Sequence, residues 1–265
     1  MNGLGVRLAF RLTVLFTVGA AVGLWGTLGA DRNTVDLILR IREEIKKLTG
    51  SYPHIVVSRL HRIKLDPNRE IEEAAQGDPE SERAWWEYHT FLEEATDLVE
   101  DEFGKGLYID LHGHGHDIAR LELGYLLSSN DLANSDETLS GAGFINKSSF
   151  RALGLEQGTD FADLIRGPQS LGSLFEVRGV PAVPSQNQPN PGGNPFFSGG
   201  YNTARHGSRD GGSVSGVQIE CNYPGIRDTE ENRQAFAEDL AEVLAVYCPE
   251  VFGVELGPVA APSGH

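Results

Sequence analysis

Three histidines alternate with glycines in the stretch Asp110-Leu-His112-Gly-His114-Gly-His116, directly after an apolar segment that is typical of a strand. In an extended chain alternate side chains point to the same side, so the three imidazoles would share one face. Imidazole is the commonest zinc ligand and a frequent acid or base in catalysis. The stretch therefore indicates a metal or catalytic centre. The alternative is a glycine-rich turn with histidines facing solvent.

A carboxylate and a basic segment could complete such a centre. Glu220 follows Gln218 by two residues in a predicted strand, where it could polarise water as a general base. A single strand glutamate is, however, more often a surface residue. Asp66-Pro-Asn68-Arg69 offers planar, forked donors that suit the capture of a substrate carboxylate. The alternative is a basic loop that pairs with the acidic helix downstream.

Arg205 and His206 lie near the end of a glycine- and proline-rich stretch from Gly179 to Ser213. A loop of that length inside a compact domain is usually functional or disordered. Glycines that flank a tyrosine, an arginine and a histidine are typical of a segment that folds over a bound ligand.

Hydrophobic spacing predicts the elements that must position these residues. Apolar residues three and four apart predict helices at 31–50, at 81–102 and after Thr229. Apolar runs predict strands at 54–58, 106–112, 121–127 and 214–222. This order predicts an α/β fold, a three-layer sandwich with a mixed, mostly parallel sheet between helices. In such folds ligands gather beyond the carboxyl ends of the strands, where the histidine stretch falls.

Composition excludes several classes of protein. The chain has 265 residues, 22 basic and 38 acidic side chains, and a net charge of −16, which argues against a nucleic-acid binder. With 40% hydrophobic residues the chain can build a core, so it is not wholly disordered. Cys221 and Cys248 are too few for a disulfide scaffold, although one bridge between them stays open.

The first residues differ in character from the rest. Leu12 to Ala30 is free of charge and follows Arg7 and Arg11, which fits a signal peptide or a marginal membrane anchor. An ordinary core segment is the alternative. We expect an apolar leader at 1–30, one domain at 31–256 and a frayed tail at 257–265. A genuine leader predicts secretion or membrane attachment through residues 12–30, and otherwise the protein is cytoplasmic.

Four motifs occur together in one order: RLHRIKLDPNRE, YIDLHGHGH, GGYNTARHGSRDGG and GVQIE. In this order they resemble the N-formylglutamate amidohydrolase family, part of the zinc carboxypeptidase and aspartoacylase superfamily. The resemblance spans Val35 to Tyr247. It implies a zinc carboxypeptidase-like, hydrolase-type sandwich that binds one zinc ion. It also implies hydrolysis of a linear, non-peptide amide in a small acidic N-acyl amino acid.

The resemblance also implies a role for individual residues. Asn68 and Arg69 would hold the substrate carboxylate, and Glu220 would activate water and then protonate the leaving amine. His112 would be the last zinc ligand, with His114 and His116 as additional ligands or supporting partners. Arg205 and His206 would contact the substrate.

One departure from the family pattern leaves the activity open. The resemblance implies first zinc ligands in a His-Gly-Gly or His-Ala-Gly loop after the first strand, but no histidine precedes His54. A catalytic zinc needs three protein ligands, and the absent first strand would leave a gap in the sheet. The chain is therefore either a zinc-dependent amidohydrolase or a metal-free pseudo-enzyme that binds carboxylates. A third reading is an interaction domain whose acidic helix engages a basic partner.

Overall fold

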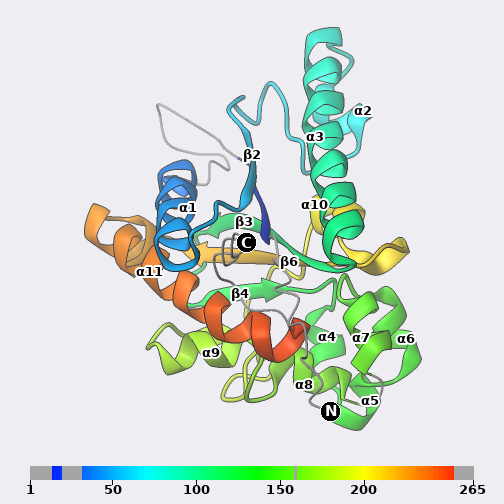
Figure 1. Ribbon diagram of the computed structural model, residues 1–265, viewed down its shortest axis with the longest axis vertical. Coiled ribbons are helices and arrows are strands. Elements are labelled where there is room, and N and C mark those ends of the chain that lie inside the picture. Colours follow the sequence, from blue (N-terminus) through cyan, green and yellow to red (C-terminus); the bar gives the residue numbers. More distant parts are fainter. Residues whose placement is uncertain (1–13, 20–31, 158–159, 254–265) are drawn as a thin grey trace, which may run out of the picture.

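A computed structural model describes residues 14–19, 32–157 and 160–253, and within them six strands form one sheet in the order β2-β1-β3-β6-β4-β5 (Figure 1). The strands are β1 (Val14–Gly19), β2 (His54–Ser58), β3 (Gly106–His114), β4 (Leu121–Gly124), β5 (Ala182–Val183) and β6 (Val214–Asn222). The first three and β6 run parallel, whereas β4 is antiparallel to β6 and parallel to β5. The predicted mixed, mostly parallel sheet is confirmed.

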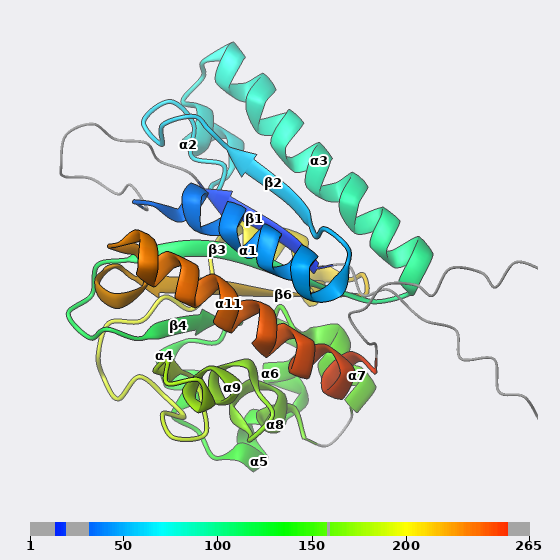
Figure 2. The same cartoon turned by 60° about the vertical axis from the view of Figure 1, so that its left-hand side comes forward.

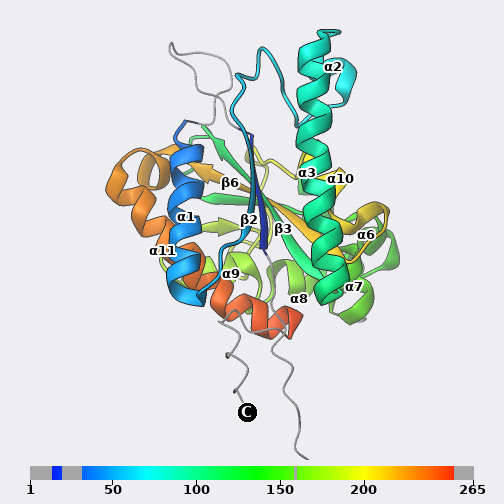
Figure 3. The ribbon, with the colours of Figure 1, turned by 45° about the horizontal axis from the view of Figure 1, so that its top comes forward.

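Helices cover both faces of this sheet, which makes three layers (Figure 3). On one face lie α1 (Thr34–Thr49), α9 (Leu171–Val177) and α11 (Glu230–Tyr247). On the other lie α3 (Pro79–Phe103), α7 (Arg151–Gln157) and α10 (Tyr201–His206). The remaining elements are α2 (Ile71–Ala75), α4 (Ser129–Leu132), α5 (Asp136–Leu139), α6 (Ala142–Lys147), α8 (Phe161–Arg166), η1 (Ser208–Asp210), η2 (Tyr223–Arg227) and η3 (Cys248–Phe252). The three-layer α/β fold is thus as predicted.

The long helices begin and end where side-chain chemistry favours it. Asp78 caps α3 by accepting the amide of Ser81 at 2.8 Å, and Thr229 caps α11 through the amide of Asn232. Gly50 and Gly104 end α1 and α3 with φ of 76° and 73°, a left-handed conformation that favours glycine. α3 projects well beyond the sheet (Figure 2).

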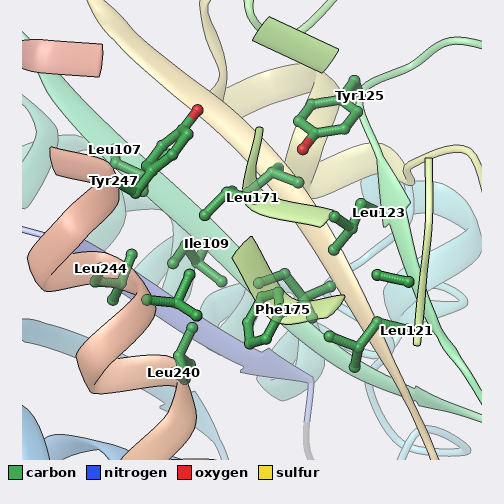
Figure 4. Close-up of a cluster of buried hydrophobic side chains, with 14 of the residues drawn as sticks. Leu107, Ile109, Leu121, Leu123, Tyr125, Leu171, Phe175, Leu240, Leu244 and Tyr247 are labelled. Carbon is green, nitrogen blue, oxygen red and sulfur yellow. The ribbon is translucent and has the colours of Figure 1, made fainter. Parts of the chain in front are cut away.

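The two faces of the central strands differ in chemistry. One face carries leucines and isoleucines that pack with α9 and α11 in a hydrophobic core (Figure 4). The labelled core residues are Leu107, Ile109, Leu121, Leu123, Tyr125, Leu171, Phe175, Leu240, Leu244 and Tyr247. The opposite face is apolar only near the start of β3 and β6, where Tyr108 and Val214 pack under α3. Further along, that face is polar, and this is where the candidate site lies.

The expectation that residues 1–30 lie outside the fold is wrong for β1. Val14–Gly19 pairs in parallel with both β2 and β3. It supplies the first strand, whose absence was expected from the sequence to leave a gap in the sheet. A strand that lies between two parallel neighbours is often one continuous apolar run, so the sequence of β1 resembles that of a leader. The rest of the predicted leader, and the tail at 257–265, lie outside the described residues. Within the described part of the chain no helix is long and apolar enough to span a membrane.

Other parts of the chain also differ from what the sequence indicated. Residues 179–213 are not one irregular loop, because β5, α10 and η1 lie within them. Helices α4 to α9 were not predicted, since helices of four to seven residues are too short to show a period. Cys221 and Cys248 are both buried, and no disulfide joins them, so the bridge that the sequence left open is not formed.

Candidate functional site

The pairing of β3 with β6 brings the two central motifs onto one face of the sheet. His112 is the register partner of Glu220, and Asp110 is the partner of Gln218. All four side chains are buried, and they lie in the carboxyl-terminal half of two parallel strands. In open α/β sheets this is where ligands and catalytic groups gather.

His112 contacts a carboxylate and an amide through the same ring nitrogen. Its Nε2 lies 3.1 Å from Oδ1 of Asp110 and 3.4 Å from Nδ2 of Asn68. A protonated Nε2 can donate to Asp110, and an unprotonated Nε2 can accept from Asn68. The ring therefore has a partner in either protonation state.

Glu220 is buried beside a second amide. Nε2 of Gln218 donates to Oε1 of Glu220 at 2.9 Å. The other end of that amide, Oε1 of Gln218, is buried and has no hydrogen-bond partner within the described part of the chain. An unsatisfied buried acceptor of this kind costs free energy unless a donor arrives, so Gln218 could accept a hydrogen bond from a ligand.

The glycine-flanked segment closes the other side of His112. The amide of Asn202 in α10 donates to Oδ1 of Asn68 at 2.8 Å, and Thr203 donates to Asp110 at 3.5 Å. A Cβ on Gly200 would lie 2.6 Å from the Asn68 amide, so only glycine fits there. The predicted ligand-covering segment therefore packs directly on the site.

His206 and Arg205 point to different partners. Nε2 of His206 lies 2.8 Å from Nδ1 of His89, and Nε2 of His89 lies 3.2 Å from the carbonyl of Pro67. Because that carbonyl only accepts, His89 carries its proton on Nε2, and its unprotonated Nδ1 accepts a hydrogen bond from Nε2 of His206. Arg205 instead pairs with Glu93 at 2.8 Å and donates to the Tyr201 hydroxyl.

The pKa of both His89 and His206 is lowered to about 3, and burial is the largest cause. The Arg205 guanidinium also lowers the pKa of both rings and the adjacent His206 lowers that of His89, whereas Asp110 acts in the opposite direction. Both rings are therefore neutral at neutral pH, and they tie α3 and α10 to the segment that carries Asn68.

This pair predicts acid sensitivity. The unfolded chain binds protons at these rings near pH 6.5, whereas the folded chain resists until about pH 3, so stability falls as pH drops through that window. We expect a loss of about 2 kcal/mol for each ring at about pH 5, and roughly 4 kcal/mol for the pair, measured by urea unfolding against about pH 7. A His206→Asn variant should show a flatter pH dependence, and the exposed His54→Gln control should not. The same change of stability with pH in the wild-type chain, His206→Asn and His54→Gln would contradict the prediction.

Arg69 stays partly accessible next to Asn68. Its Nη1 donates to the Asn68 carbonyl at 3.0 Å, and its Nε lies 3.2 Å from Glu73. The Arg69 and Glu73 side chains are 44% and 72% exposed, so their ion pair is weak and a substrate anion could replace it.

The histidine stretch does not act as one group. His112 turns to Asp110 and Asn68, whereas His114 and His116 gather with Glu122, and these three residues could hold a metal ion. Glu122 is fully buried, and sequence reasoning missed it. Its strand position next to Glu220 depends on β4 running antiparallel to β6, which no local pattern predicted.

Around His112 the residues do not fit a three-ligand zinc site. Among the residues that the structure describes, no group of three His, Cys, Asp or Glu side chains with metal-ligand spacing includes His112. An amide nitrogen of Asn68 also faces its Nε2, and an NH₂ group cannot ligate a cation. We therefore assign no catalytic step to a metal at His112.

Arg227 is a second residue that sequence reasoning missed. Its guanidinium donates to the carbonyls of Cys221, Arg32 and His114 at 2.8 to 3.0 Å. A Cβ on Gly113 would lie 2.1 Å from the Arg227 guanidinium carbon, which explains a glycine within the histidine stretch. The only sequence signal was that glycine.

Comparison with solved structures places the molecule in an amidohydrolase-type α/β fold. A gene product of Agrobacterium tumefaciens superposes with a TM-score of 0.53 at 12% identity, over 92% of this chain and 93% of the other. The N-formylglutamate amidohydrolase of Ralstonia eutropha superposes with a TM-score of 0.50 at 14% identity, over 92% and 95%. No protein-family model and no curated protein matches the sequence. At these identities the two similarities show the fold alone. This α/β fold agrees with the one that the order of the four motifs implied.

Proposed function

We propose that this protein hydrolyses the amide bond of a small, acidic N-acyl amino acid of the N-formylglutamate kind. The observation that carries the proposal is the buried, register-paired His112 and Glu220 at the carboxyl ends of adjacent parallel strands. A fold similar to that of an N-formylglutamate amidohydrolase supports it. No nucleic acid is proposed as a partner.

In this proposal Glu220 moves the proton. Water attacks the acyl carbon while Glu220 accepts a proton from it, and the carbon–nitrogen bond then breaks. Glu220 returns that proton to the leaving nitrogen, so the products are a carboxylic acid and an amino acid. Gln218 holds the Glu220 carboxylate in place, and His112 contacts the carbonyl oxygen of the substrate.

Arg69 is proposed to bind the substrate carboxylate from the rim of the site. Its guanidinium can exchange the exposed Glu73 for a substrate anion in a bidentate geometry. Asn68 is committed to His112 and Asn202, so it acts by holding the site together. Arg205 and His206 are further from this role, because their partners are Glu93 and His89.

An Arg69→Ala substitution tests this role. We expect KM to rise by about 10- to 100-fold with a smaller change in kcat, since the lost contact is made equally in the ground and transition states. Steady-state kinetics with N-formyl-L-glutamate measure both constants. Arg83→Ala removes a more exposed arginine that pairs with Glu80 and Glu87 on α3, and it should leave KM unchanged. An unaltered KM in Arg69→Ala would exclude the proposed contact.

The function itself is tested by release of free amine from N-formyl- and N-acetyl-amino acids. Turnover that prefers glutamate and aspartate derivatives supports the proposal. The second candidate, a metal-free carboxylate-binding module, is favoured by the hydrogen bonds of His112 to Asn68 and Asp110. It predicts that N-formylglutamate raises Tm without turnover and that a chelator changes nothing.

A further inference from the structure

The three residues His114, His116 and Glu122 place ligand atoms within 4.8 Å of one another. His114 ends β3 and His116 follows it by two residues, with their ring centroids 5.1 Å apart. Glu122 comes from the neighbouring part of β4, and its Oε1 lies 2.9 Å from Nδ1 of His116. Two imidazoles and one carboxylate form a donor set found in catalytic zinc sites, with a fourth position left open.

We propose that these three side chains bind one divalent transition-metal ion, Zn²⁺ or a chemically similar ion, at a site distinct from His112. Metal binding stands independently of the proposed function. The use of the metal in amide hydrolysis rests on that function.

The contacts around the three residues already hold them in the orientation that a ligand needs. Nε2 of His114 lies 2.8 Å from the Arg120 carbonyl, which only accepts, so the proton sits on Nε2 and Nδ1 keeps its lone pair. The second oxygen of Glu122 accepts the amide of Phe197 at 2.8 Å. Metal-ligating histidines usually donate their other ring nitrogen to a carbonyl or carboxylate, and ligating carboxylates are likewise hydrogen-bonded.

His116 is held by stacking. Its ring lies parallel to Phe197, with centroids 4.7 Å apart and an interplanar angle of 11°. The backbone amide of His116 donates to Nδ1 of His114 at 3.1 Å, and Nδ1 of His116 donates to Oε1 of Glu122 at 2.9 Å. A bound cation would replace these two hydrogen bonds by coordination to Nδ1 of His114, Nδ1 of His116 and Oε1 of Glu122, with the His116 proton moving to Nε2.

The charges around the three residues determine which kind of ligand the fourth coordination position of a bound metal ion would prefer. Nε of Arg120 lies 3.9 Å from Glu122, and its other nitrogens donate to Gln188 and Pro195. A dication beside this guanidinium leaves an excess of positive charge over the single carboxylate. The fourth position should therefore prefer an anion, such as hydroxide or a substrate carboxylate.

The site lies next to the proposed catalytic base. Glu122 is the antiparallel register partner of Glu220, and His114 follows His112 by two residues on the same face of β3. His114 in β3 and Glu122 in β4 thus lie on the two strands that flank β6, the strand that carries Glu220.

Cobalt binding to the full chain tests the proposal. After chelator treatment and gel filtration, one equivalent of Co²⁺ should give the visible absorption of a tetrahedral or five-coordinate site, and calorimetry should give one Zn²⁺ per chain. His116→Gln should weaken binding by about 100-fold or more, since loss of a partner behind a ligand alone costs 10- to 100-fold. The exposed His54→Gln serves as the matched control and should bind normally. His116→Cys should restore binding and add a thiolate-to-cobalt charge-transfer band.

His112→Gln separates this site from one centred on His112. Binding kept in His112→Gln and lost in His116→Gln supports the proposal, and the reverse pattern overturns it. No stoichiometric binding by the wild-type chain also overturns it. Binding without amide hydrolysis leaves the site standing and removes the proposed function. Hydrolysis that persists after the metal has been removed leaves the proposed function standing and overturns any use of the metal in it.

Discussion

Replacement of Glu220 by glutamine is expected to lower kcat for amide hydrolysis by about 10²- to 10⁴-fold, the range that general bases contribute. Glutamine has the same shape and can still meet the Gln218 amide, but it cannot accept a proton from water. KM should change little, because Arg69 rather than Glu220 binds the substrate carboxylate in the proposed function. The measurement is steady-state release of free amine from N-formyl-L-glutamate.

The matched control is Glu87→Gln, an equally conservative change of an exposed glutamate on α3. It should leave kcat and Tm at their wild-type values. Unfolding curves of Glu220→Gln must match those of the wild-type chain, so that a lost activity reflects lost chemistry. Full activity in Glu220→Gln would remove Glu220 from the mechanism.

Replacement of Arg227 by methionine is expected to lower the free energy of unfolding by about 3–5 kcal/mol. The Arg227 side chain is only 3% exposed. Its guanidinium satisfies carbonyls at the ends of β3 and β6 and at Arg32, ahead of α1. Methionine fills much of the same space but removes the donor from all three carbonyls, two of which, those of Cys221 and His114, are bonded in buried surroundings. Urea unfolding of the two chains measures the difference.

Two further variants test the cause of that loss. Arg209→Met removes an exposed arginine that pairs with the adjacent Asp210, and it should change stability by less than about 0.5 kcal/mol. Gly113→Ala should be destabilising in the same sense, because the new methyl group must displace the Arg227 guanidinium. Wild-type stability in both Arg227→Met and Gly113→Ala would contradict a structural role for this contact.

Much of the secondary structure could be predicted because its signals are local. The spacing of Ile38, Ile41 and Ile45 reports a helix with one buried face, and all three are buried in α1. The apolar run before His112 reports a central strand. β1 was misassigned because the signal is local. An apolar run looks the same in a central strand, a core segment and a leader.

The candidate site was predicted in its residues but not in its partners. The sequence placed His112 and Glu220 at strand ends, and the four motifs indicated that they belong together. Alternation alone could not distinguish the partners of His112 from those of His114 and His116, because it predicts all three imidazoles on one side of an extended chain. The side chains that surround each ring make the difference, because Asp110 and Asn68 contact His112, whereas Glu122 contacts His116.

By itself, then, the sequence determined the longer helices, most of the strands, the three-layer α/β class and the residues able to do chemistry, because period, composition and motif order can be read along the chain. Only the tertiary structure decided that Val14–Gly19 completes the sheet, that β6 lies between β3 and β4, and that Arg227 fills the space beside Gly113. These arrangements join residues far apart in the chain. Their free energy comes from burial and hydrogen bonding among segments that the local sequence does not record.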